Sequence, residues 1–434
     1  MTTLDEIVWD AVLVVLLITL VYTLPLTILG VIFARRRGGS LRGQLTAEAG
    51  PPATLPGCWS VFVIIPCLNE ERVIATTVRC LLDSQPGVRV IVVDDGSDDA
   101  TAELAAAAEH VSIVRRTLPE ARKGKGAALN AGLCSVRRRV EEEGLDRTRV
   151  LVCVLDADGR LTPGAAAQVT RLFEDPTVGG AQLAVRIRGR RHWALRFQDI
   201  EFWGLSALGQ FGRVATGSVS IGGNGQFTRL AALDSAGQDP WSHSLTEDLD
   251  LGISLAVHGW TVTSTAAGFV SQQGLTCPRR LLRQRTRWYQ GHMSSITRLP
   301  ELWASSVCPA AARLELTGYL LIPYITTLPW SLLQQYLLLR LLQRAAEFDP
   351  TAADSMWMGI ATAIVWCLLS FVANLVWAVL YWRRTNDLPL WKAAGYCVAL
   401  ALWSYTGFIA CWRAIWRIAT GRRGWVKTER AQEA

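Results

Sequence analysis

Long apolar segments stand at both ends of the chain, and sequence typical of a soluble domain separates the first from the others. The four segments are 7–33, 316–339, 356–382 and 393–411. Each is long enough to form a helix across a hydrocarbon core of ~30 Å, which takes ~20 residues. The pattern predicts an N-terminal transmembrane anchor (residues 1–34) and a C-terminal transmembrane region (residues 314–418) of about three spans.

The sequence between these ends has a different periodicity, in which short apolar runs alternate with amphipathic stretches. The apolar runs predict strands at 61–66, 88–93, 111–115 and 150–155. The amphipathic stretches predict helices at 71–82, 99–109 and 126–143. Continuous apolar strands separated by helices are typical of a doubly wound, mostly parallel sheet, which binds ligands at the carboxyl ends of its strands. We therefore predict one α/β domain over residues 58–275.

Three shorter segments complete the expected organisation. Residues 35–57 are first basic and then rich in Pro and Gly, which predicts a linker. Residues 276–313 are rich in Arg and Trp, which favours helices at a membrane surface. Residues 419–434 form a basic tail.

The distribution of positive charge predicts the orientation of the chain. Arg35, Arg36, Arg37 and Arg42 follow the first apolar segment, and positive charge stays on the cytosolic side of a membrane. We therefore expect a multi-pass protein of the plasma membrane whose middle domain is cytosolic. Three further spans place the C-terminus outside, whereas the five basic residues between 413 and 427 are typical of the cytosolic side. We therefore expect one late segment to be a hairpin or to lie on the membrane surface.

Composition narrows the classes of function. Hydrophobic residues make up 50% of the 434 residues. The net charge is only +7, and a nucleic-acid-binding protein would show denser basic patches. The ten cysteines include no CxxC pair and no Cys/His cluster, so reduced thiols are expected and a zinc site is not.

Carboxylates follow three of the predicted strands. Glu70 comes after the first strand, Asp94 and Asp95 after the second, and Asp156 and Asp158 after the fourth. Each could be a helix cap or a turn residue, which is the commoner role. Their repetition at one edge of one sheet favours a binding site instead. Two carboxylates at i, i+2 suit Mg²⁺ or Mn²⁺, which usually completes its shell with substrate phosphates.

Three later segments add polar chemistry. Lys125 precedes a predicted helix between two glycines, which is typical of an anion site or of a flexible basic loop. Residues 222–226 (GGNGQ) allow close backbone approach. Glu247 and Asp248 open a helix that is predicted to run to about residue 258, where acids can simply favour the helix dipole.

The stretch LLRQRTRWYQGH (residues 281–292) gathers positive charge and aromatic surface about twenty-five residues before an apolar segment. At helical spacing, Gln284, Arg287 and Trp288 share one face. Arg287 can bind a diphosphate bidentately, and Trp288 offers a flat surface for a sugar ring. Arg285 and His292 are expected to face elsewhere, towards lipid headgroups. The alternative is a plain amphipathic helix on the membrane surface.

The order of these motifs resembles glycosyltransferase family 2, in the membrane-integrated branch that includes synthases of cellulose, hyaluronan, chitin oligosaccharides and poly-N-acetylglucosamine. The matching motifs are IPCLNEE (65–71), VDDGSDD (93–99), GKGAALNAG (124–132), DAD (156–158), TED (246–248) and QRTRW (284–288). The resemblance implies a nucleotide-sugar-binding α/β domain of the GT-A type together with transmembrane helices.

The resemblance also implies a role for each candidate residue. Asp95, Asp94, Glu70 and Pro66 would hold the uridine, and Lys125 would lie near the nucleotide or diphosphate. Asp158, with Asp156, would bind the diphosphate through Mg²⁺ or Mn²⁺, and Asp248 would be the catalytic base. The residues expected to close over the diphosphate and the acceptor are Gln284, Arg287, Trp288, Asn224, Gln226 and Glu247.

The implied reaction is a single displacement that inverts the anomeric centre, so an α-linked UDP-sugar yields a β-linkage. The acceptor hydroxyl is a weak nucleophile, so a carboxylate must take its proton. The metal and Arg287 would stabilise the charge that develops on the leaving UDP.

The identity of the acceptor stays open between two enzymatic hypotheses. The first is a synthase that extends a β-linked polysaccharide and exports it, with accessory export or regulatory proteins unknown; the QRTRW motif favours it. The second is a single-addition glycolipid synthase, for example on diacylglycerol. Asn224, Gly225 and Gln226 stand where many polymer-making members carry a Ser-Gly-small motif, which favours the second. A polar path lined by tryptophans along the C-terminal helices would distinguish the first from the second.

A third hypothesis is a non-enzymatic membrane protein that recruits anionic lipid or nucleic acid through its basic helix. That protein would have no use for the acids at 95, 158 and 248.

Overall fold

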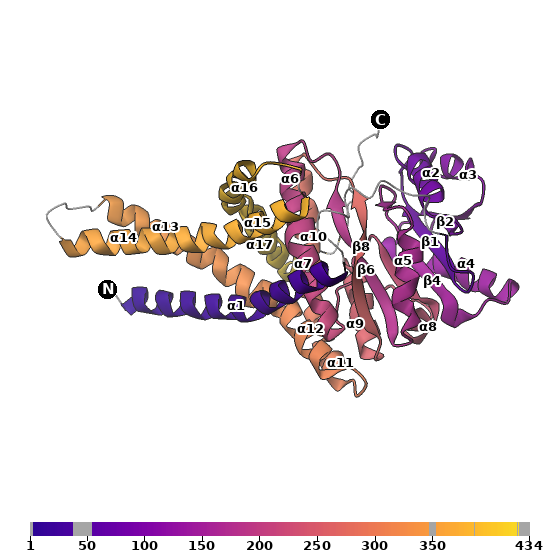
Figure 1. Cartoon of the computed structure of the whole chain (residues 1–434), viewed down its shortest axis with the longest axis horizontal. Helices are drawn as coiled ribbons and strands as arrows, with labels where there is room; N and C mark the ends of the chain where they lie inside the picture. The colour runs from indigo at the N-terminus through magenta and orange to yellow at the C-terminus, as the bar shows by residue number, and fades with distance from the viewer. Residues whose placement is uncertain (1–2, 38–53, 347–352, 386, 423, 425–434) are drawn as a thin grey trace.

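A computed structural model describes residues 3–37, 54–346, 353–385, 387–422 and 424. A twisted sheet flanked by helices occupies one end of the molecule, and long helices extend from it to the other end (Figure 1). Most of the predicted linker and of the basic tail lies outside the described residues.

The sheet has eight strands in the order β3-β2-β1-β4-β7-β6-β8-β5. The strands are β1 (Ser60–Cys67), β2 (Arg89–Asp94), β3 (Val111–Arg115), β4 (Val150–Val154), β5 (Arg160–Leu161), β6 (Val178–Ile187), β7 (Gln226–Arg229) and β8 (Thr261–Gln272). The first four predicted strands are confirmed, and they pair in parallel. β7 runs antiparallel to both β4 and β6, so the second half of the sheet is mixed.

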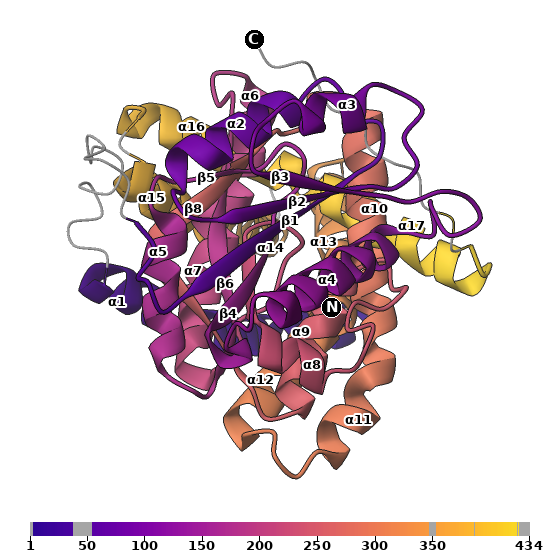
Figure 2. The same ribbon diagram turned by 90° about the vertical axis from the view of Figure 1, so that its right-hand side faces the viewer.

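Helices cover both faces of the sheet, as expected for a doubly wound domain (Figure 2). The helices of this domain are α2 (Ile74–Ser84), α3 (Thr101–Ala106), α4 (Lys125–Glu142), α5 (Ala165–Thr170), α6 (Trp193–Asp199), α7 (Ala207–Arg213), α8 (Leu230–Ser235) and α9 (Glu247–Val257). One core lies beneath α2 and α5, and the other lies beneath α4, α8 and α9. Because β1, β2 and β4 are buried on both faces, their sequences are continuously apolar rather than alternating.

Two predicted helices begin later than expected, and polar contacts explain both shifts. The carbonyl oxygen of Glu70 accepts from the backbone N–H groups of Val73 and Ile74, so residues 70–73 form a turn before α2. The carboxylate of Asp99 accepts from the backbone N–H of Thr101 at 3.0 Å, which forms a turn just before α3.

The remaining helices connect the domain with the membrane region. They are α1 (Thr3–Arg37), α10 (Pro278–Ser294), α11 (Leu299–Ala304), α12 (Ala310–Ile322), α13 (Leu328–Ala346), α14 (Ala353–Cys367), α15 (Ala373–Thr385), α16 (Leu390–Trp403) and α17 (Tyr405–Ala419). A π-helical turn at Ile200–Ser206 joins α6 to α7. A second such turn, Pro323–Thr327, joins α12 to α13.

Within the described residues, three helices are long and apolar enough to cross a membrane: Glu6–Arg36, Ala310–Gln343 and Leu390–Ala419. They correspond to three of the four predicted segments. The fourth, 356–382, is helical from α14 to α15, which lie beside α13 in the bundle that extends from the domain (Figure 1). α1 and α13 pack together through Val12, Val15, Leu333 and Leu337.

The N-terminal helix docks on the α/β domain through a very close crossing of α1 and α7. A Cβ atom on Gly212 would lie 2.1 Å from the backbone oxygen of Leu26, and one on Gly30 would lie 2.0 Å from that of Leu208. Real Cβ atoms do not approach backbone oxygen so closely, so glycine at both positions is what allows the two backbones to meet.

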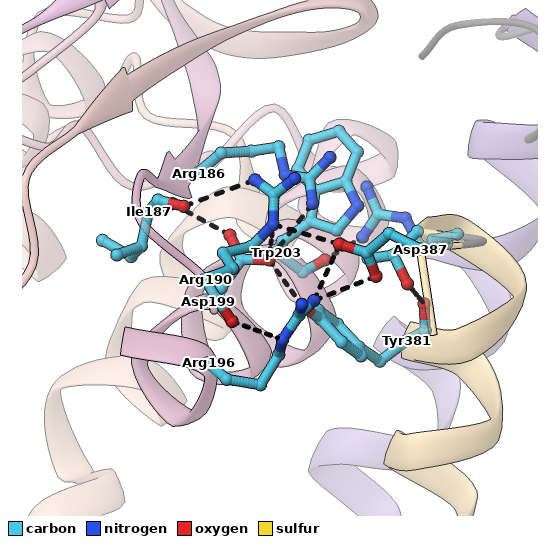
Figure 3. A network of polar contacts seen from close by, with 10 residues as sticks. Arg186, Ile187, Arg190, Arg196, Asp199, Trp203, Tyr381 and Asp387 are labelled. Carbon is cyan, nitrogen blue, oxygen red and sulfur yellow. Dashed lines mark hydrogen bonds and ion pairs between the residues drawn. The ribbon is translucent and has the colours of Figure 1, made fainter. Parts of the chain in front are cut away.

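A buried polar network joins the C-terminal helices to the same domain (Figure 3). The fully buried carboxylate of Asp199 accepts from Arg186 at 3.1 Å and from the hydroxyl of Tyr381, on α15, at 2.6 Å. Arg196 donates to Asp387, which follows α15, at 2.8 Å. A buried charge left without its partner is costly, so these contacts specify how α15 meets the domain.

We expect Gly212→Ala to destabilise the protein, because the added methyl group must displace backbone rather than a flexible side chain. Overpacking of this kind typically costs about 1–3 kcal/mol, so the midpoint of thermal unfolding in detergent should fall by several degrees. Gly209→Ala is the matched control, because a Cβ at Gly209 of the same helix meets nothing within 4 Å. Equal midpoints for the two variants would contradict the close crossing.

Candidate active site

A cavity of about 320 Å³ lies at the carboxyl edge of β4, between the sheet, α9 and α10. Eight of the predicted site residues line it: Lys125, Asp156, Asn224, Glu247, Asp248, Gln284, Arg287 and Trp288. They come from segments more than 150 residues apart in the sequence. The fold therefore assembles in one place most of the chemistry that the motifs predict.

Lys125 stands at the centre of the polar side of the cavity, at the N-terminus of α4. Its Nζ atom lies 2.6 Å from Oδ1 of Asp156, 2.7 Å from the carbonyl oxygen of Gly223 and 3.9 Å from Oε1 of Glu247. Burial lowers the pKa of Lys125, but the nearby carboxylates outweigh it and raise the pKa above its usual value. The site thus contains a fixed positive charge, which suits an anionic substrate.

Gly223 makes this arrangement possible. A Cβ at Gly223 would lie 2.7 Å from Nζ of Lys125 and 3.2 Å from Oδ2 of Asp248. The expected close approach of the backbone in GGNGQ is therefore confirmed. The turn is held by Gln182 of β6, whose side chain accepts from the N–H of Gly222 and donates to the carbonyl oxygen of Asn224, both at 2.8 Å.

Glu247 and Asp248 occupy the first turn of α9, whose predicted start and end are confirmed. Burial raises the pKa of both carboxyls, and Lys125 and Arg287 oppose the shift. For Glu247 the negative charge of Asp248 adds to the effect of burial, and its pKa reaches about 7. A buried carboxylate with a raised pKa is a stronger base than a free one, which fits proton abstraction from a hydroxyl.

The α10 helix presents Gln284, Arg287 and Trp288 to the cavity, as their spacing predicts. The Trp288 ring meets Phe202 edge to face, with centroids 5.8 Å apart. The guanidinium of Arg285 lies 4.7 Å from the centre of the Trp288 ring and forms an ion pair with Glu201.

Two expectations for this helix were wrong. Arg285 does not face lipid headgroups, because its ion pair with Glu201 and the aromatic rings hold it inside the protein. His292 also points inward: it lines the cavity and its Nε2 lies 2.9 Å from the carbonyl oxygen of Tyr319. Burial lowers the pKa of His292 to about 4, so its imidazole is neutral near pH 7.

The residues expected to hold the uridine lie along the adjoining strand ends rather than in the cavity. Asp94 ends β2 and Asp95 follows it, and Glu70 comes after β1, which lies between β2 and β4. All three are largely buried, whereas Pro66, near the end of β1, is partly exposed. Burial raises the pKa of Asp95, and an ion pair with Arg116 acts in the opposite direction.

Three further candidates take supporting positions. Asn224 accepts from the backbone N–H of Asp156 at 3.1 Å and donates to Gln272 at 2.9 Å, so it fixes the strand end that carries Asp156. Gln226 is fully buried within β7 and is not among the cavity residues, because strand pairing turns it into the sheet's core. Asp158 is fully buried and accepts from the backbone N–H of Gln273 at 2.9 Å.

The DAD carboxylates fit a hard divalent cation that is shared with a substrate. No group of three or more His, Cys, Asp or Glu side chains gathers as a closed metal site among the described residues. Asp156 faces the cavity and already contacts a cation, the ammonium of Lys125. Carboxylate oxygens are the ligands that Mg²⁺ and Mn²⁺ prefer, and substrate phosphates commonly supply the rest.

Several cavity residues were not predicted from the sequence. They are Gln182, Phe202, Ser206, Gln210, Ser220, Gln272 and Tyr319, with small and apolar neighbours. Gln182 is the single polar residue of an otherwise apolar strand segment, which is a usable signal. Tyr319 carries no signal, because it belongs to a helix that reads as part of a membrane segment.

Comparison with known proteins gives a consistent result. The sequence matches the family described as "Glycosyltransferase like family 2" over residues 56–291. It is 31% identical over 272 residues to a beta-monoglucosyldiacylglycerol synthase of Trichormus variabilis (61% of this chain, 53% of that protein). It is 33% identical over 266 residues to one of Synechocystis (57% and 52%). The chain thus spans about half the length of these curated relatives.

Among solved structures, the mannosyltransferase PcManGT from Pyrobaculum calidifontis, in complex with GDP-Man and Mn²⁺, superimposes with a TM-score of 0.50 at 17% identity. The match covers 92% of this chain and 100% of that one. The predicted GT-A-type fold is confirmed. The family match extends over more than half of the chain, and it coincides with the sheet and with the cavity just described. The chain belongs to glycosyltransferase family 2.

We expect Asp248→Asn to retain binding of the nucleotide-sugar and to lose transfer, because the amide cannot take a proton. General-base contributions are about 10²–10⁴-fold, measurable as the rate of nucleotide release with acceptor present. Asp250→Asn is the control: Asp250 lies in the same turn of α9 but pairs with Arg298 and does not line the cavity. Activity of Asp248→Asn within threefold of the unmodified protein would assign the base to another residue.

The raised pKa values predict how the rate depends on pH. Glu247 binds a proton as the pH falls through about 7, and burial raises the pKa of Asp248 as well, so falling pH removes the charge that a base needs. Transfer at limiting substrate should therefore decline on the acidic side of pH 7. The Glu247→Gln variant removes the neighbouring charge. The inflection of its pH–rate profile, measured from pH 5 to 9, should therefore lie at lower pH. An inflection that stays in place would exclude this pair as its source.

Proposed function

We propose that this protein transfers one sugar from a UDP-sugar to a hydroxyl group of a membrane lipid, with inversion at the anomeric carbon. Diacylglycerol is the proposed acceptor class. Two relatives that are 31% and 33% identical are named beta-monoglucosyldiacylglycerol synthases, which supports this acceptor and glucose as the sugar. The Asn-Gly-Gln sequence at 224–226 supports it as well.

One observation carries the proposal: the acceptor side of the cavity is built from helices that continue into the membrane region. Tyr319 lines the cavity and belongs to the apolar helix Ala310–Gln343. Ala207 and Gln210 line it from α7, the helix that crosses α1. A hydroxyl group at the bilayer surface would therefore lie close to the reacting centre without leaving the membrane.

The cavity residues have distinct roles in this reaction. Asp248 takes the proton from the acceptor hydroxyl, while Lys125 and Arg287 bind the diphosphate of the leaving UDP. Trp288 supports the sugar or the acceptor. Asp95, Asp94 and Glu70 bind the uridine at the adjoining strand ends.

Asp156 and Asp158 would hold Mg²⁺ or Mn²⁺, whose positive charge stabilises the departing diphosphate. The PcManGT structure, which shares this fold, is a complex with Mn²⁺ and a nucleotide-sugar, and this supports a divalent ion here.

The positions of the tryptophans argue against a polymer path through the C-terminal helices. Trp288 is the one tryptophan among the cavity residues. Trp330 and Trp366 pack against α1, and Trp403 lies in the core beside α6. Among the described residues, the tryptophans of the C-terminal helices thus serve packing or face outward, which supports single addition over polysaccharide export.

The orientation follows from charge. We propose that the N-terminus lies outside and that the glycosyltransferase domain is cytosolic, where UDP-sugars are made, on the inner face of the plasma membrane.

The acceptor can be identified with purified protein in lipid nanodiscs, a panel of radiolabelled UDP-sugars and a divalent cation. With diacylglycerol in the discs, label should enter a solvent-extractable lipid that carries one sugar, and without diacylglycerol it should not. Asp248→Asn serves as the inactive control. Label in water-soluble chains of many sugars would instead establish a polysaccharide synthase and overturn the proposal.

A further inference from the structure

The last two helices run in a direction that sets them apart from the other long helices. α1, α13 and α14 extend along the long axis of the molecule, away from the sheet (Figure 1). α16 and α17 follow one another almost without interruption from residue 390 to 419 and run across that axis, beside the domain (Figure 2). If the first group crosses a bilayer, α16 and α17 lie along its surface.

One face of this long helix is apolar and exposed. The exposed residues recur every three, four or seven positions, which at 3.6 residues per turn places them in a single stripe. The stripe consists of Trp391, Val398, Leu402, Ile409, Trp412 and Trp416, while Leu390 and Ile418, near the two ends of the helix, are exposed outside it. Leu402 is 75% exposed and Val398 is 60% exposed, values that a water-soluble surface seldom shows in so regular a row.

The opposite face is already occupied by the protein. Leu400 and Trp403 pack in the core formed with α6, and Cys411 and Ala414 pack against Met293 of α10. The exposed stripe therefore needs a partner other than this domain.

Positive charge follows the stripe. Lys392 lies over the ring of Trp391 at 5.2 Å, and Arg422 lies over the ring of Trp416 at 4.3 Å. Arg413 is exposed next to Trp412. Aromatic rings beside basic groups are typical of helices that lie among lipid headgroups, where the rings enter the acyl boundary and the cations meet phosphates.

We propose that α16 and α17 form one helix that lies in the headgroup layer of the cytosolic leaflet and binds anionic phospholipids. Its apolar stripe enters the bilayer surface, and Arg413 and Arg422 meet lipid phosphate groups. The segment 393–411 is then not a span, so the basic residues after it share the cytosolic side with the domain. With one span fewer, the basic C-terminal residues lie on the cytosolic side, as their charge predicts.

The same helix is linked to the site. Arg417 donates to the side chain of Gln290 on α10 at 2.7 Å, and Gln290 donates to the carbonyl oxygen of Arg422, also at 2.7 Å. Gln290 lies two residues after Trp288. The lipid surface thus supports the helix that carries the cavity residues Gln284, Arg287 and Trp288.

Depth measurements with spin labels can test the proposal without relying on transfer activity. The starting protein would be an active variant without native cysteines, held in nanodiscs. A single cysteine, which carries the spin label, would replace in turn Val398, Leu402, Ile409 and Trp416. Collision with oxygen and with a water-soluble nickel complex reports the depth of each label. A helix in the headgroup layer predicts similar depths, about 5–10 Å below the phosphates. A spanning helix predicts depths that change steadily over ~27 Å, at ~1.5 Å per residue, and would overturn the proposal.

A second copy of the chain is the other way to cover the stripe. In that case the labels would be immobilised, protected from oxygen and broadened by contact with one another, which would also overturn the proposal.

The choice of anionic lipid has its own test. A cysteine at position 409 should react with a water-soluble maleimide about fivefold more slowly in discs that contain phosphatidylglycerol than in neutral discs, roughly the effect of one arginine at an anionic surface. Arg413→Gln should reduce this difference, and Arg138→Gln, on the exposed face of α4 in the domain, should not. If the protein with Arg413 unchanged reacts with the maleimide at equal rates in both kinds of disc, the preference for anionic lipid is refuted.

Discussion

The crossing of α1 and α7 is the contact on which the arrangement of this enzyme depends. Two glycines let the backbone of an apolar N-terminal helix touch the backbone of the catalytic domain. α7 also contributes Ala207 and Gln210 to the wall of the cavity. The distance between the membrane helix and the reacting centre is therefore set by backbone contact, which adjusts far less than contact between side chains.

Buried ion pairs complete the attachment at two more places. Arg213 of α7 pairs with Glu315 of α12 at 2.7 Å, and its guanidinium lies 3.8 Å from the centre of the Tyr319 ring, which lines the cavity. Asp199, Arg186 and Tyr381 join the other edge of the domain to α15. Such pairs add little net stability but penalise any arrangement that separates them. They therefore favour one placement of the domain on its helices.

The sequence predicted the parts of this protein whose signals are local. Continuous apolar runs identified β1 to β4. The acidic, glycine and QRTRW motifs identified the charged cavity residues, because each lies at a strand end or on one helix face. Gln226 was misplaced, since only the register of β7 shows that its side chain enters the core. Arg285 and His292 were misassigned because their partners, Glu201 and the carbonyl oxygen of Tyr319, lie 84 and 27 residues away. Tertiary contacts of that kind leave no periodic trace in the chain.

The fixed attachment of the domain has a kinetic consequence. If the cavity lies at the bilayer and the acceptor is the membrane lipid proposed above, the enzyme would search for that acceptor in two dimensions rather than three. Its rate would then depend on the mole fraction of acceptor within the surface and not on the total amount present. Dilution by inert lipid would slow each molecule even when water, donor and protein concentrations stay the same, so the composition of the membrane would itself set the pace of synthesis.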